Sequence, residues 1–368
     1  MSRKLFPLSL TATLLAGTAM AEVPRVAVDI APVHSLVARV MEGIGTPELI
    51  VPAGASPHEY SLRPSEAAAL QEADLVVWMG ADLSPWMDSA IDTLTEGAEV
   101  TALLEADETM LLEFREDALF EGHAHGEHGH DHAEEESHDH DHDHAEEASH
   151  NHDHDHDHAE EAAHDHDHEE HAEEAAHDHD HDEHAEAEAH DHDHDHAHGA
   201  HDPHAWLSPD NAAAGLNLIA GELSAADPDN AGAYFANAAA AQDELAALKD
   251  EIDGILAPVR GGRFVVFHDA YQYFETAFDF LASGAISLSD ARDPSPARIA
   301  EIQGRVADEG IDCVLAEPQF DPGIVATVME GTDARTAVLD PLGSDLAPGP
   351  DLYPQLMRNL ATSLASCL

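Results

Sequence analysis

One segment of the chain, residues 121–201, contains almost nothing from which a folded core could be built. It alternates His with Asp, and the phrase His-Ala-Glu-Glu-Ala recurs within it. Leu, Ile, Val and aromatic residues are nearly absent, so burial cannot offset the entropy lost on ordering. We therefore predict a disordered insertion here, and the fold must be built from the residues on either side.

The charge of the chain limits its partners. The formal net charge is −62, and Lys and Arg are absent between Arg115 and Lys249. A surface this acidic excludes a nucleic-acid partner, because phosphate recognition requires clustered basic residues.

The first 21 residues have the pattern of a signal peptide. Arg3 and Lys4 precede an apolar run from Leu5 to Leu15, and Ala19-Met20-Ala21 forms a cleavage site. The apolar run is too short to span a bilayer, and no later segment approaches the roughly 20 apolar residues that a spanning helix needs. We expect cleavage after Ala21 and export to the periplasm.

The chain contains two cysteines, Cys313 and Cys367. In an exported protein an even pair predicts one disulfide, since the compartment is oxidising. Two buried free thiols are the alternative.

Short apolar runs alternate with helical patterns on both sides of the insertion, which predicts α/β units with mostly parallel sheets. The runs predicted as strands are Arg25–Ile30, Glu48–Val51, Leu75–Met79, Glu99–Leu103, Arg263–Phe267, Cys313–Ala316 and Ala337–Leu339. The segments predicted as helices are Leu36–Glu42, Ser65–Gln71, Pro85–Leu94, a helix capped by Asp210 and ending near Leu223, Asp229–Leu256, Ala270–Phe278, Pro296–Glu309, Pro322–Met329 and Leu352–Ala365.

These elements predict two α/β lobes joined by one long rigid helix, with the binding site in the cleft between the lobes. After the signal peptide (1–21), the predicted parts are the first part of the N-terminal lobe (22–120), the insertion (121–201), the remainder of that lobe (202–228), the connector helix (229–258) and the C-terminal lobe (259–368).

Few histidines lie outside the insertion. His58 stands in a Gly/Pro turn, His268 closes a strand-like run, and His204 lies in an ordered turn that contains Pro203 and Trp206. Imidazole is the commonest zinc ligand, and a strand's carboxyl end is where open α/β sheets bind ligands. His58, His204 and His268 are thus a candidate metal-ligand set, each with an ordinary structural histidine as the alternative. We interpret His34, at a helix start, as structural.

Several phrases of the chain resemble one family. They are Gly54-Ala-Ser-Pro-His58-Glu-Tyr-Ser-Leu-Arg-Pro-Ser65, Asp202-Pro-His204-Ala-Trp-Leu-Ser-Pro209, Val266-Phe-His268-Asp-Ala-Tyr271, Ala316-Glu-Pro-Gln-Phe320 and Leu339-Asp-Pro-Leu-Gly343. In this order they resemble the zinc-specific solute-binding proteins of bacterial ABC importers, the ZnuA-like members of metal-binding cluster A-I. An acidic, His-rich loop between the first two ligand motifs is also typical of the zinc members.

The resemblance implies that His58, His204 and His268 are the metal ligands. It also implies the two-lobed fold, the Cys313–Cys367 disulfide and, for the fourth ligand, either Asp340 or a water. Some zinc members carry a carboxylate just before the first ligand, but Pro57 stands there in this chain, and Glu59 is a weak substitute.

The predicted function is extracytoplasmic capture of Zn(II) and its delivery, by a monomer that is not an enzyme, to the permease of an ABC importer. Three imidazoles favour zinc over manganese, whereas Cu(II) and Ni(II) would also bind on intrinsic affinity. The insertion offers many weak zinc sites, for scavenging or sensing, with a merely solubilising loop as the alternative.

Three other functions remain open from the sequence. A periplasmic zinc buffer or chaperone would use mainly the insertion, and a manganese importer component would use Asp340. An exported zinc hydrolase would need a general base. The chain has no H-E-x-x-H motif, and Glu317 is the only obvious base.

Overall fold

The computed structural model describes residues 23–115, 201–287 and 294–368. The predicted signal peptide and nearly all of the predicted insertion lie outside these residues. The described residues belong to one compact unit, which contains two parallel sheets of four strands each.

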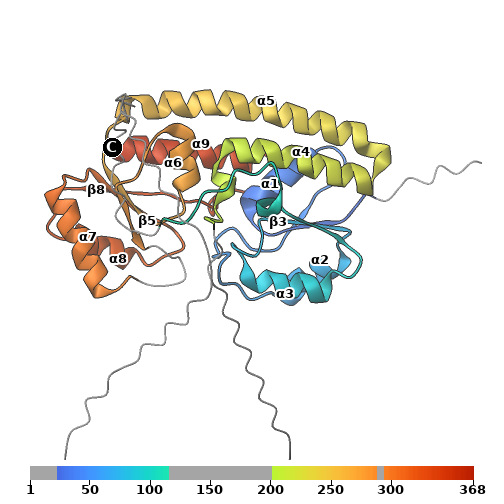
Figure 1. Ribbon diagram of the computed structural model, residues 1–368, viewed down its shortest axis with the longest axis horizontal. Coiled ribbons are helices and arrows are strands. Elements are labelled where there is room, and N and C mark those ends of the chain that lie inside the picture. The colour runs from blue at the N-terminus through green and yellow to red at the C-terminus, as the bar shows by residue number, and fades with distance from the viewer. Residues whose placement is uncertain (1–22, 116–200, 288–293) are drawn as a thin grey trace, which may run out of the picture. The chain divides into compact units, whose positions relative to one another are not determined.

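The first sheet lies in the N-terminal half of the chain (Figure 1). Its strands are β1 (Val26–Val28), β2 (Glu48–Leu49), β3 (Leu75–Trp78) and β4 (Glu99–Ala102), in the order β2-β1-β3-β4. Its helices are α1 (Ala31–Val40), α2 (Pro64–Glu72) and α3 (Pro85–Leu94), with a 3₁₀ turn η1 (Leu103–Glu105) after β4. Helix α1 begins five residues earlier than predicted, because Pro32 has the φ that the first helical turn requires.

The second sheet repeats this arrangement in the C-terminal half. Its strands are β5 (Phe264–His268), β6 (Gly284–Ser287), β7 (Cys313–Ala316) and β8 (Arg335–Val338), in the order β6-β5-β7-β8. Its helices are α6 (Gln272–Phe278), α7 (Pro296–Asp308), α8 (Pro322–Met329) and α9 (Leu352–Cys367). Strand β6 is not among the strands predicted from the sequence, because in its four residues Ile286 is the only β-branched one.

Helices α4 (Pro209–Ala226) and α5 (Ala231–Leu256) connect the two halves, and α5 runs alongside α4 and α9 (Figure 1). The 3₁₀ turns η3 (Pro228–Asn230) and η4 (Ala257–Val259) flank α5, which confirms the predicted connector helix. The prediction that Asp210 caps α4 is wrong. The cap is Ser208, whose hydroxyl accepts a hydrogen bond from the Asn211 amide at 3.2 Å, and Asp210 instead binds Lys249.

One continuous core joins the two sheets. Strand residues alternate between faces, so Val26, Val28, Phe264 and Val266 all face a core shared with α1, α4, α5 and α9. The opposite faces have separate cores, one against α2 and α3 and one against α7 and α8. Because the shared core is continuous, we expect only small movements of one lobe against the other.

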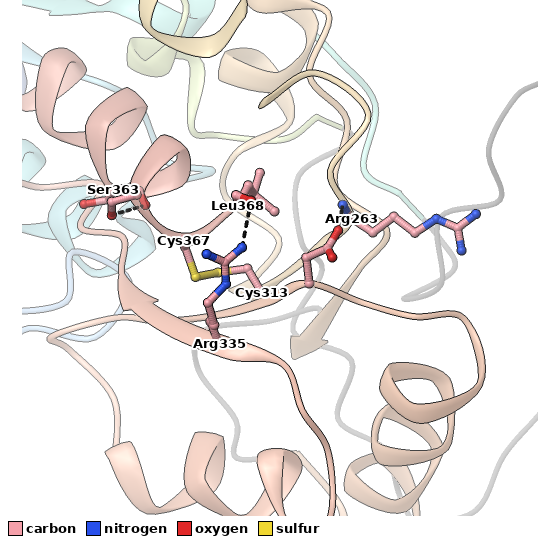
Figure 2. Close-up of a disulfide and its surroundings, with 8 residues drawn as sticks. Arg263, Cys313, Arg335, Ser363, Cys367 and Leu368 are labelled. Atoms are coloured by element: carbon pink, nitrogen blue, oxygen red, sulfur yellow. Dashed lines mark hydrogen bonds between the residues drawn. A yellow bond between two sulfur atoms is a disulfide. The ribbon is translucent and has the colours of Figure 1, made fainter. Parts of the chain in front are cut away.

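The C-terminal helix is tied to the second sheet by a disulfide. Cys313 at the start of β7 and Cys367 at the end of α9 are bonded, with a Cα–Cα distance of 5.8 Å. Figure 2 shows Arg335 beside this bond, donating to the carbonyl oxygen of Leu368 at 2.7 Å. The predicted disulfide is therefore confirmed.

Among the described residues, no helix is both long enough and apolar enough to cross a membrane.

Candidate metal centre

His58 is positioned by a turn that packs onto helix α3. The Pro57 carbonyl accepts two hydrogen bonds, from the Ser84 hydroxyl at 3.0 Å and from the Trp86 indole N–H at 2.7 Å. The Ser56 hydroxyl also accepts the His58 amide at 3.3 Å. The carbonyl of the preceding residue is thus fixed, which aims the half-buried His58 ring.

His204 is positioned by the turn that precedes η2 (Ala205–Leu207). A single oxygen of Asp202, Oδ1, accepts the His204 backbone amide at 3.0 Å and lies 2.7 Å from its ring Nδ1. Both side chains are buried. The other ring nitrogen, Nε2, is also buried and has no hydrogen-bond partner within residues 23–115, 201–287 and 294–368.

His268 is the last residue of β5, at the carboxyl edge of the second sheet. Glu317, the residue after β7, accepts the His268 amide at 3.1 Å and lies 2.7 Å from ring Nδ1. Both side chains are buried. As in the pair formed by His204 and Asp202, a carboxylate fixes the ring orientation and directs the opposite nitrogen outward.

The three imidazoles converge. The ring centroids of His58 and His204 are 5.4 Å apart, and those of His204 and His268 are 5.3 Å apart. With Zn–N bonds of about 2.0–2.1 Å and tetrahedral angles, the centroids of two ligating imidazoles lie roughly 5 Å apart. Both measured spacings are therefore close to those of a ligand set.

The rings line a small cavity with a free volume of about 20 Å³, enough for one water-sized occupant. Its apolar wall comes from Trp206, Phe320, Pro341 and Leu342. Among the described residues, no group of three His, Cys, Asp or Glu side chains is placed so that it could hold a metal ion without rearrangement.

Asp340 is held inside its own loop. Its Oδ1 accepts from the Gln319 amide at 3.1 Å and the Leu342 backbone at 3.0 Å, and its Oδ2 accepts from Ser344 N at 2.6 Å. Asp340 is absent from the cavity wall. In this arrangement the carboxylate shapes the loop after β8 and is not brought together with the imidazoles.

The remaining candidates lie away from the cavity. The His34 ring is buried in α1, with its Nε2 3.1 Å from the Pro47 carbonyl oxygen, and burial lowers the pKa of this imidazole below its usual value. Glu59 is exposed. Neither residue lines the cavity.

The two carboxylates that orient the rings could not be assigned this role from the sequence patterns alone. Asp202 was noted only as part of a motif, and Glu317 only as a candidate base. A carboxylate beside each proposed ligand could have been expected, because metal-binding histidines commonly donate their second N–H to a carboxylate. What could not be read from sequence was that Glu317, 49 residues after His268, would lie beside it.

Tyr271 is another buried polar residue beside the site. Its hydroxyl donates to the Leu339 carbonyl at 3.0 Å. Burial, together with the negative charges of Glu317 and Asp340, raises the pKa of Tyr271 well above its usual value. Tyr271 is therefore a permanent donor that links β5 to the loop after β8.

Comparisons with known proteins identify the family of the chain. The family model for ZnuA, the periplasmic zinc-uptake complex component A, matches residues 26–367. The high-affinity zinc uptake system protein ZnuA of Brucella abortus (strain 2308) is 42% identical over 370 residues, covering 100% of this chain and 99% of the relative. The ZnuA of Paracoccus denitrificans is 42% identical over 367 residues, 98% of each chain.

A crystal structure of ZnuA has the same fold, with a TM-score of 0.64 at 19% identity, covering 94% of this chain and 99% of that one. The resemblance inferred from the sequence phrases is thus confirmed by an independent match over almost the whole chain. The chain belongs to the ZnuA family of periplasmic zinc-uptake complex components.

Proposed function

We propose that this protein captures one Zn(II) ion between its two lobes and delivers it to the permease of an ABC importer. The imidazoles of His58, His204 and His268 bind the ion. One observation carries the proposal: the buried Nε2 of His204 has no hydrogen-bond partner among the described residues, and the His204 ring lies 5.4 and 5.3 Å from the rings of His58 and His268. A buried polar atom without a partner is costly, and a metal ion would satisfy it.

The composition of the site favours zinc over manganese. Three neutral imidazoles suit Zn(II), whereas Mn(II) prefers oxygen-rich sites. The buried carboxylates of Asp202 and Glu317 add negative charge behind two of the rings, which stabilises a dication in front of them. Selection against Cu(II) and Ni(II) would then depend on geometry and metal supply.

We propose a water molecule, not Asp340, as the fourth ligand. Both oxygens of Asp340 already accept hydrogen bonds from its own loop and from Gln319. Gln319, in contrast, lines the cavity, and its buried Oε1 has no hydrogen-bond partner in the part of the chain that the structure describes. That oxygen is available to accept a hydrogen bond from a metal-bound water.

Transport explains the site better than hydrolysis does. Glu317, the candidate base named from the sequence, is buried, and its Oε1 accepts the His268 amide and lies 2.7 Å from ring Nδ1, so this carboxylate orients a ligand. Family membership points to a solute-binding component of a transporter. We therefore infer a non-enzymatic monomer, exported to the periplasm by residues 1–21, whose partner is a permease coupled to a cytoplasmic ATPase.

Calorimetric zinc titration of the mature protein tests the proposal. We expect one tight site that disappears in a His58→Ala/His268→Ala double variant and persists in a His34→Asn control, because His34 lies outside the cavity. Tight binding that survives the double substitution would contradict the proposal.

A second titration separates import from buffering. Deleting residues 121–199, while keeping His201 and the turn that carries His204, should remove weak sites and leave the tight site unchanged. If the tight site is lost with the deletion, the insertion is the main binding element and the buffer function is favoured. A sustained turnover of ester or peptide substrates by the zinc form would instead favour the hydrolase.

A further inference from the structure

The two chain segments that flank the insertion meet on helix α6 of the second lobe. Glu113 and His201 form an antiparallel bridge, and the Asp202 amide donates to the Leu112 carbonyl at 2.8 Å. The Tyr273 hydroxyl joins the same two segments. It accepts the Leu112 amide at 3.0 Å and donates to the Asp202 carbonyl at 2.8 Å.

Arg115 strengthens this junction with two ion pairs. Its guanidinium donates through Nε to Asp269 at 3.0 Å, and through Nη1 and Nη2 to Glu275 at 2.8 and 3.1 Å. A further bond joins Nη2 to Asp269. The side chains of Asp269 and Glu275 are only 5% and 1% exposed, so Arg115 is the cation that neutralises two buried carboxylates.

The residues on both sides of this junction are adjacent to, or hydrogen-bonded to, proposed zinc ligands. Asp269 follows His268 in the sequence, at the point where β5 turns into α6. Asp202 holds the ring of His204 through its carboxylate. The junction therefore connects the backbone that carries one ligand to the carboxylate that orients another.

We infer that Arg115 is a positioning residue of the metal centre. By binding Asp269 and Glu275 from the segment that enters the insertion, it fixes the distance between the imidazoles of His204 and His268. The segment that leads into the insertion is thus part of the structure that positions the proposed metal ligands. This inference rests on the proposed function, in which these imidazoles hold the ion.

Arg115 differs from a residue in a surface ion pair because both of its partner carboxylates are buried. Without the guanidinium, two buried carboxylates face each other uncompensated, and removing one partner of a buried pair is strongly unfavourable. The turn after His268 is expected to shift to separate or hydrate them. Groups that bind a metal ligand directly typically contribute 10–100-fold in affinity. Arg115 acts through Asp269, one contact further away, so we expect a loss at the lower end of this range, about 10-fold.

The chain supplies a matched control for the test. Arg39 also contacts two carboxylates, Glu42 and Glu244, and its side chain is 19% exposed, against 17% for Arg115. It joins α1 to α5 and does not line the cavity. Arg39→Met therefore removes an equally buried guanidinium with two carboxylate contacts outside the site, although Glu42 and Glu244 themselves are 54% and 58% exposed.

The experiment compares full-length wild type, Arg115→Met and Arg39→Met. Zinc affinity is measured by chelator competition, release by stopped flow, and ligand geometry by the visible spectrum of the Co(II)-substituted protein. We expect Arg115→Met to bind zinc about 10-fold more weakly, to release it faster and to have an altered Co(II) spectrum. Arg39→Met is expected to match wild type in all three.

Wild-type affinity and an unchanged Co(II) spectrum in Arg115→Met would overturn the inference, because Arg115 would then serve stability alone. If instead wild type itself binds no zinc tightly, or His204→Ala binds as tightly as wild type, the proposed function fails and not only the role of Arg115.

A milder variant covers the case in which Arg115→Met does not fold. Tyr273→Phe removes only the hydroxyl that joins Leu112 to Asp202, and Tyr234→Phe, which removes a buried hydroxyl bound to Asp227, is its control. Faster zinc release in Tyr273→Phe alone supports the inference, and equal release rates in both variants contradict it.

Discussion

The two sheets share one topology but differ in what stands at the end of their first strand. In the order β2-β1-β3-β4, strand β1 is followed by Asp29, whereas in the order β6-β5-β7-β8, strand β5 ends at His268. The carboxyl edge of an open parallel sheet is where ligands bind. Only the second sheet places a proposed metal ligand at this position.

A buried carboxylate links the two central strands in each sheet, but it comes from opposite strands. Asp29 follows β1, and its oxygens accept the amides of Ile30 and of Met79, just after β3, both at 2.7 Å. Glu317 follows β7 and accepts the amide and ring of His268 on β5.

The origin of the linking carboxylate determines whether the first strand of the sheet can end in a proposed metal ligand. Where the linking carboxylate comes from the neighbouring strand, the end of the first strand is free to carry an imidazole. Where the first strand supplies the carboxylate itself, the ligand must come from elsewhere. The first lobe accordingly contributes His58 from a turn that is held by Ser84 and Trp86.

The largest expected effect is on zinc affinity, when the residues at the ends of the two first strands are substituted. His268→Ala should weaken zinc binding by at least about 100-fold, since a ligand contributes more than the 10–100-fold of an outer partner. Asp29→Ala should leave zinc affinity unchanged and lower the free energy of unfolding by about 1–3 kcal/mol for each buried amide left unpaired. Calorimetry and denaturant unfolding measure the two quantities. Equal zinc affinities in the two variants would contradict the comparison.

The second lobe also contains a disulfide, whereas the described part of the first lobe contains none. The Cys313–Cys367 bond joins residues 54 apart in sequence. Replacing both cysteines by Ser should lower the free energy of unfolding by about 2–5 kcal/mol. Urea denaturation of the oxidised protein and of the variant measures this. A stability equal to wild type would show that α9 is held by packing alone.

The linking carboxylates themselves should differ in function. Glu317→Gln should weaken zinc binding by about 10–100-fold, because the amide stabilises the bound imidazole less well than a carboxylate does. Asp29→Asn, its counterpart, should not change zinc affinity. Competition titration against a chelator distinguishes the two variants. An affinity loss in Asp29→Asn as large as that in Glu317→Gln would show that the metal centre depends on the whole edge of both sheets.

The smallest effect is a pH dependence that belongs to the first lobe. Burial raises the pKa of Asp29 from 3.8 to about 7, although backbone amides oppose the shift. A raised folded-state pKa gives stability that is fully present below pH 3.8 and is lost as the pH rises through about 7.

The slope of stability against pH should be at most about 1.4 kcal/mol per pH unit. It should disappear in Asp29→Asn when unfolding is measured between pH 4 and 7 and compared with wild type. The comparison with wild type cancels the contribution of His34, whose lowered pKa acts with the opposite sign. Identical slopes would contradict the assignment to Asp29.

Much of the fold could be predicted from sequence because its elements are locally encoded. The alternation of apolar runs and helical patterns located seven of the eight described strands, and the long Ala-rich run predicted α5. Strand β6 could not be predicted because its four residues carry little local signal. Its pairing with β5 depends on tertiary contacts that no local pattern records.

The candidate site was predicted only in part, for the same reason. His58, His204 and His268 stand in distinctive local phrases, so each could be proposed from sequence. The pairing of Glu317 with His268, and of Arg115 with Asp269, joins residues 49 and 154 positions apart. Such contacts are fixed by strand order and by the path of the chain across the lobes, which local spacing does not reveal.

Diffraction from a zinc-loaded crystal at the zinc absorption edge tests the convergence of the three imidazoles most directly. We predict one anomalous peak in the cavity, about 2.0–2.1 Å from a ring nitrogen of each of His58, His204 and His268. A peak bound by Asp340 in place of one imidazole, or the three rings turned away from any common ion, would contradict it.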